Sequence, residues 1–117
     1  MKLIARALVL FTGNIAGLML ARELVPGFLL AATNHGVLTT ALVLGLLNLT
    51  LKPFLKLILS PLIILTLGFV LILINAVVLG VLDIFTDNLT ILGILPLLFS
   101  SLIIGLVNFI FHLGTKP

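Results

Sequence analysis

Long apolar stretches separated by short polar ones dominate the pattern of this chain. Runs without Asp, Glu, Lys or Arg cover residues 7–21, 24–51, 57–82 and 88–115. A helix that crosses a bilayer needs about 20 mostly apolar residues, and turn-forming residues at the ends of the three longer runs shorten the part that spans. The pattern therefore predicts four membrane-spanning helices, near residues 4–22, 36–52, 64–83 and 95–112.

Proline marks the predicted connections. Pro26-Gly27 breaks the chain after the first helix, and Lys52-Pro53 ends the second, because the residue before proline is pushed out of the helical region. Pro53 then opens a short interfacial segment at about residues 53–60. Backbone groups in lipid find no water, and the runs lack the alternation of a barrel strand. The prediction is an all-α integral membrane protein with a single transmembrane domain, residues 1–117.

Composition narrows the possible functions. Hydrophobic residues make up 62% of the chain and charged residues 8%, which excludes a water-soluble globule, where about 25% are charged. Cysteine is absent, and three acidic residues and two histidines form no catalytic or metal-binding motif. The six cations are spread along the chain and form no nucleic-acid patch. We expect no enzyme activity, no cofactor, no metal and no nucleic-acid partner.

The distribution of charge predicts the orientation. Four antiparallel spans place five cations on one side, namely Lys2, Arg6, Lys52, Lys56 and Lys116. The other side receives Arg22 and all three acids, namely Glu23, Asp83 and Asp87. By the positive-inside rule, both termini are then cytoplasmic.

The second and fourth predicted helices share a sequence pattern. Residues 41–48 (ALVLGLLN) read almost as residues 101–108 (SLIIGLVN), an offset of 60 residues, and with one gap Asn14 corresponds to Asn75. The repeat predicts two tandem helical hairpins, a parallel 2+2 repeat about an axis along the membrane normal, forming a four-helix bundle.

Each predicted helix also carries two small residues four apart and one asparagine. The set comprises Gly13, Asn14, Gly17, Ala41, Gly45, Asn48, Asn75, Ala76, Gly80, Ser101, Gly105 and Asn108. Small residues let helices approach closely, and a carboxamide in hydrocarbon requires a partner. One interpretation is that the asparagines hold helices together; the other is that they line a water-filled path. Lys52 and Lys56 suit anionic lipid head groups, or ordinary anchoring at the membrane surface.

The order of several motifs resembles a known family. Val25-Pro26-Gly27-Phe28, the segment 41–48, Leu51-Lys52-Pro53-Phe54, Ile64-Leu65-Thr66-Leu67-Gly68 and Ile74-Asn75-Ala76 together resemble phage holin family 4, also called holin superfamily IV, over roughly residues 10–112. In place of the family's second proline–glycine–phenylalanine element, this chain has Ile84-Phe85-Thr86.

The resemblance implies a self-associating protein of the bacterial inner membrane that forms lesions or pores. The alternative is a structural or accessory subunit of a larger membrane complex, or a lipid-binding envelope protein without pore activity. The lipid bilayer is the expected partner in both cases, together with either further copies of the chain or the larger complex.

Overall fold

The computed structural model describes residues 2–31 and 33–114. Its elements are α1 (Lys2–Leu24), β1 (Phe28–Leu30), α2 (Asn34–Ile58), α3 (Ser60–Leu65), α4 (Val70–Phe85), β2 (Leu89–Ile91) and α5 (Ile94–Leu113). The predicted predominance of long apolar helices is confirmed. Lys116, which the charge pattern assigns to the cytoplasmic side, lies outside the described residues.

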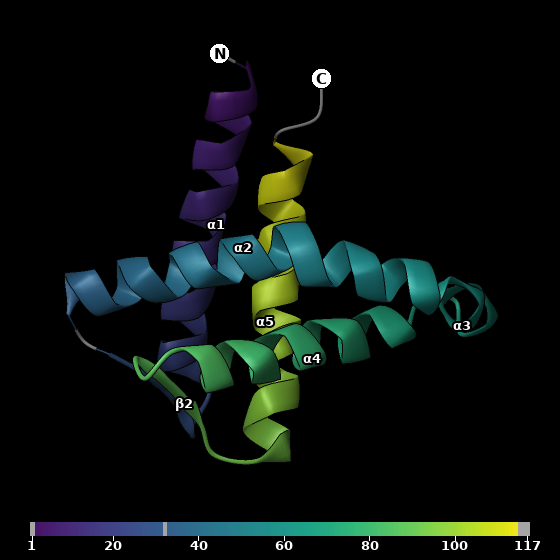
Figure 1. Ribbon diagram of the computed structural model, residues 1–117. Helices are drawn as coiled ribbons and strands as arrows, with labels where there is room; N and C mark the ends of the chain where they lie inside the picture. The colour runs from purple at the N-terminus through teal and green to yellow at the C-terminus, as the bar shows by residue number, and fades with distance from the viewer. Residues whose placement is uncertain (1, 32, 115–117) are drawn as a thin grey trace.

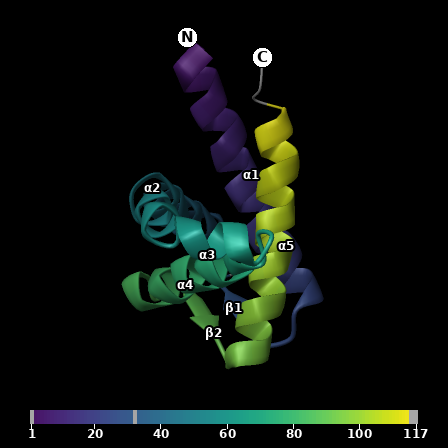
Figure 2. The ribbon, with the colours of Figure 1, turned by 90° about the vertical axis from the view of Figure 1, so that its right-hand side faces the viewer.

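The four longest helices form two crossed pairs. α1 and α5 lie side by side and run in opposite directions, and α2 and α4 form a second pair that runs across them (Figure 1). Turning the molecule shows the two pairs as two layers (Figure 2). α1 also contacts α2, and α4 also contacts α5. The core between the layers is aliphatic and includes Leu18, Leu44, Leu79, Leu82 and Ile104.

α2 continues past Pro53, where the sequence predicts an end. Proline removes one backbone donor, so the carbonyl four residues earlier, on Leu49, loses its usual partner. Both residues are exposed at the helix surface. Helical bonding then resumes, and Leu59 N donates to Leu55 O at 2.9 Å. The predicted interfacial segment is therefore mostly the last part of α2.

The predicted third span is divided at residues 66–69. Gly68 N donates to Ile63 O at 2.8 Å and Leu67 N donates to Ile64 O at 3.2 Å, the bond pair that closes a helix C-terminus in a Schellman motif. Leu67, with φ 54°, occupies the left-handed position where glycine is usual, and Gly68 follows at φ 92°. This turn separates α3 from α4.

Three of the described helices, α1, α2 and α5, are long and apolar enough to cross a membrane. The fourth long element, α4, has 16 residues and is a shorter apolar helix. At a rise of 1.5 Å per residue it extends about 24 Å, which is less than the hydrocarbon thickness of about 30 Å.

A two-stranded antiparallel ribbon joins the two connections at one end of the fold. β1 pairs with β2 in the register Phe28↔Ile91, Leu29↔Thr90, Leu30↔Leu89. Two further bonds extend it, Ala31 N to Asn88 O and Leu92 N to Gly27 O, each 2.8 Å. The pattern of the sequence predicts no strand here, because three residues are too few to show a period of two. The ribbon ties the α1–α2 connection to the α4–α5 connection.

Candidate functional site: a carboxamide cluster where the helices cross

Asn14 of α1 is buried, with 4% of its surface exposed, and meets two residues of α2. Asn48 Nδ2 donates to Asn14 Oδ1 at 3.5 Å, which is long for an N–H···O bond. Asn14 Nδ2 lies 3.4 Å from the position that a Cβ would occupy on Gly45. The carboxamide of α1 therefore packs on the bare backbone of α2.

The same arrangement recurs between α4 and α5. Asn75 Nδ2 lies only 2.6 Å from the position of a Cβ on Gly105. A methyl group at Gly105 would overlap the carboxamide, so glycine is required for the side chain of Asn75 to lie where it does. The contact of Asn14 with Gly45 and the contact of Asn75 with Gly105 thus have the same form.

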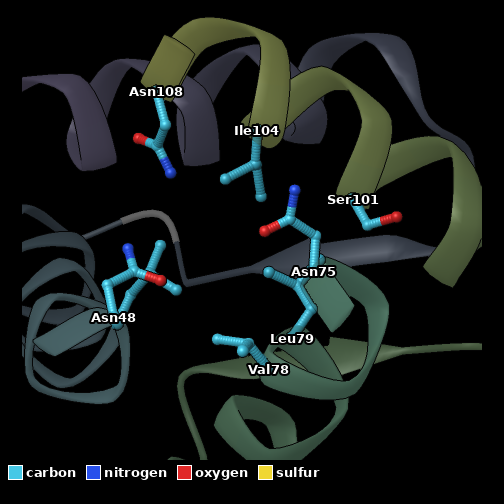
Figure 3. Close-up of a pocket in the computed structure, with 8 residues that line it drawn as sticks. Asn48, Asn75, Val78, Leu79, Ser101, Ile104 and Asn108 are labelled. Atoms are coloured by element: carbon cyan, nitrogen blue, oxygen red, sulfur yellow. The ribbon is translucent and has the colours of Figure 1, made fainter. Parts of the chain in front are cut away.

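A small cavity lies among the carboxamides. Its volume is about 10 Å³, and it is lined by Leu44, Asn48, Asn75, Val78, Leu79, Ser101, Ile104 and Asn108. Asn48 comes from α2, Asn75 from α4 and Asn108 from α5, and the three side chains surround one space (Figure 3). The polar side chains that the sequence places in separate helices therefore meet at one point in the fold.

Glycines of α1 permit its close contact with α5. A Cβ on Gly17 would lie 3.4 Å from the backbone Cα of Ile104, and one on Gly13 would lie 2.9 Å from Cγ of Phe111. The helices approach at these positions because no side chain intervenes.

The other predicted small positions differ in their surroundings. Ala41 and Ala76 are buried. Ser101 is also buried and donates from Oγ to Leu98 O at 2.8 Å, which satisfies its hydroxyl within α5. A Cβ on Gly80 would meet no atom within 4 Å, so no neighbour requires a glycine there.

The charged residues lie apart from the cluster, toward the helix ends. Lys52 is partly buried and Lys56 exposed, both near the end of α2. Arg22 Nε lies 3.7 Å from Glu23 Oε1 at the end of α1. Within residues 2–31 and 33–114, no group of three His, Asp or Glu side chains is placed to hold a metal ion.

Asp83 has a structural role that the sequence pattern does not indicate. Its Oδ2 accepts a hydrogen bond from the backbone N–H of Ile91 at 3.1 Å, which ties the end of α4 to β2. The bond spans eight residues across the turn that follows α4. A strand predicted at residues 89–91 could have indicated this role, because its outward-facing backbone N–H groups need acceptors.

A comparison with protein families matches residues 1–110, nearly the whole chain, to the mycobacterial 4 TMS (four transmembrane segment) phage holins of superfamily IV. The chain belongs to this holin family. No curated protein matches the chain, and no solved structure does. Family membership and the long apolar helices together show that the chain is a multi-pass membrane protein. The resemblance noted in the sequence is confirmed.

Proposed function

We propose that the protein is a holin-like protein of the bacterial inner membrane that self-associates and opens lesions in the bilayer. The observation that carries this proposal is the distribution of polarity. Large apolar side chains face outward on every long helix, for example Leu3, Leu49, Ile84 and Phe109. The asparagines instead gather where the helices cross. Lipid suits the outer surface, and the carboxamides supply polar groups at membrane depth.

A lesion formed by this protein requires more than one copy. The cavity inside one chain is about 10 Å³, roughly the volume for a single water molecule, and is far too small for a channel. A water-filled path would therefore form between copies, with the carboxamides as its polar lining. Holin family membership supports the same conclusion.

The topology proposed with this function is two repeated halves with both termini in the cytoplasm. α1–β1–α2 and α4–β2–α5 are the halves, and three features support their equivalence: the antiparallel ribbon, the matched helix pairs and the two asparagine–glycine contacts. If the membrane normal lies between the direction of the α1–α5 pair and the direction of the α2–α4 pair, all four helices are tilted from that normal. The ribbon then lies on one side, with the start of α1 and the end of α5 on the other (Figure 1).

A structural or accessory subunit of a larger membrane complex is the alternative. The contact of Asn14 with Asn48 favours it, because a carboxamide that is partnered within one chain acts as packing. Lys52 and Lys56 near the end of α2 would hold anionic lipid head groups in either case.

The deciding experiment is induced expression in bacteria with a potential-sensitive dye. We expect the membrane potential to collapse once the inserted protein reaches a threshold amount. Asn108→Leu, which keeps the size and removes an amide, should insert equally and delay the collapse. Val77→Leu, on the exposed face of α4, is the matched control and should behave as wild type. Full membrane insertion without loss of potential would overturn the lesion proposal and favour the accessory subunit.

A further inference from the structure

The cavity at the helix crossing has the size and the lining of a water site. Its volume of about 10 Å³ is close to the smallest space that holds one water molecule, and a bound water needs two to four polar partners. Asn48, Asn75 and Asn108 supply carboxamides from three different helices around this space (Figure 3). The site therefore meets both requirements.

The carboxamides around the cavity have hydrogen-bonding capacity to spare. Each has two donors on nitrogen and two acceptor positions on oxygen. In the described part of the chain, these three side chains make one hydrogen bond within the protein, from Asn48 to Asn14. The carboxamides of Asn75 and Asn108 therefore have no protein partner there. Asn48, Asn75 and Asn108 are half-buried. A carboxamide at membrane depth that meets lipid instead of a polar partner is costly, which favours a water between them.

We propose that this cavity binds one ordered water molecule, which bridges the carboxamides of Asn48, Asn75 and Asn108. The water links α2, α4 and α5, and the bond from Asn48 to Asn14 extends the network to α1. One polar cluster then joins all four long helices. The site belongs to a single subunit, so it goes beyond the proposed function and does not depend on lesion formation.

Water fits this site better than a cation does. The lining consists of three neutral carboxamides, the Ser101 hydroxyl and apolar side chains, with no carboxylate among them. A cation without a counter-charge at membrane depth carries a large desolvation cost. The Ser101 hydroxyl already donates to Leu98 O, which leaves it as an acceptor for the water.

The test is NMR of the intact protein in lipid nanodiscs with ¹⁵N-labelled asparagine. We expect cross-peaks between a long-lived water and the side-chain amides of Asn75 and Asn108, unchanged when sodium is replaced by choline. Val78→Leu adds bulk at the cavity wall and should abolish these cross-peaks. Val77→Leu, next to it in sequence but 49% exposed, should retain them.

Three results would overturn the water site. They are no water cross-peak in folded wild-type protein, cross-peaks that persist in folded Val78→Leu, and a signal that requires sodium. If Val78→Leu does not fold, Val78→Ile replaces it, because isoleucine adds the same single carbon and keeps the β-branched shape of valine. Since the measurement does not involve the membrane potential, its failure is distinct from failure of the lesion proposal.

Discussion

Asn14 Oδ1 accepts a hydrogen bond from Asn48 Nδ2 although 34 residues separate them. Asn14 is buried at 4% exposure and rests on Gly45, one helical turn before Asn48. The small residue and the asparagine of α2 therefore act together: the glycine admits the carboxamide of α1, and the asparagine binds it. α5 places Gly105 against the carboxamide of Asn75 in a similar way, and Asn108 lines the cavity beside it rather than bonding to Asn75.

The bond between Asn14 and Asn48 should be weak but measurable. Interhelical hydrogen bonds in membranes average about 0.6 kcal/mol, and this bond is long. In a double-mutant cycle with Asn14→Leu and Asn48→Leu, we expect a coupling energy of about 0.5 kcal/mol. The measurement is unfolding in mixed micelles followed by circular dichroism. A coupling near zero would show that the two carboxamides act independently.

Gly105→Ala should destabilise the contact between α4 and α5. The new methyl group would lie 2.6 Å from Asn75 Nδ2, so the carboxamide, the far end of a flexible side chain, must move, and we expect Gly105→Ala to be less stable than Gly80→Ala by about 1 kcal/mol. Gly80→Ala is the matched control, because nothing lies within 4 Å and the better helix propensity of alanine adds up to about 1 kcal/mol. Equal stability of the two variants, measured by unfolding, would contradict this assignment.

Gly17→Leu should separate α1 from α5. A Cβ at Gly17 already meets the backbone of Ile104 at 3.4 Å, so the larger side chain of leucine has no room without a shift of a whole helix. Spin labels on exposed positions of α1 and α5, such as Leu8 and Ile110, would report a longer distance by double electron–electron resonance. Gly80→Leu serves as the control and should leave the label distance unchanged. An unaltered distance in Gly17→Leu would contradict the close approach.

Asp83→Ala should loosen the end of the ribbon. Without the carboxylate, the N–H of Ile91 loses its acceptor, and a buried or half-buried donor left unpaired costs about 1–3 kcal/mol. We expect faster hydrogen exchange at residues 89–91 and little change in α1. Asp83→Asn keeps one carbonyl oxygen and should show a smaller effect, and Asp87→Asn, at an exposed position, should show none. Unchanged exchange at Ile91 in Asp83→Ala would mean that the bond does not hold β2.

Cysteine labelling tests the proposed orientation in a chain that has no cysteine of its own. An impermeant thiol reagent added outside should label Asn34→Cys and Thr90→Cys, which lie in or near the connections that carry the ribbon. Ser60→Cys and Gly114→Cys should react only after the membrane is opened. The reverse pattern would place both termini outside and contradict the positive-inside argument.

The membrane character, the four apolar segments and the match between residues 41–48 and 101–108 follow from the sequence alone. Charge-free runs of this length are typical of membrane-spanning helices, and the match of residues 41–48 with 101–108 already pairs Gly45 with Gly105 and Asn48 with Asn108. Local sequence also determines where α1 and α5 begin and end, because each helix extends only one or two residues beyond its predicted span.

Only the tertiary structure decides which helix each asparagine meets. Periodicity shows that Asn14 and Asn48 each lie beside a small residue, but the partner depends on the crossing of the two helix pairs. The ribbon depends on two connections about 60 residues apart, and α2 continues through Pro53, where the local rule for proline predicts an end. These features arise from contacts between distant segments, and no local pattern encodes them.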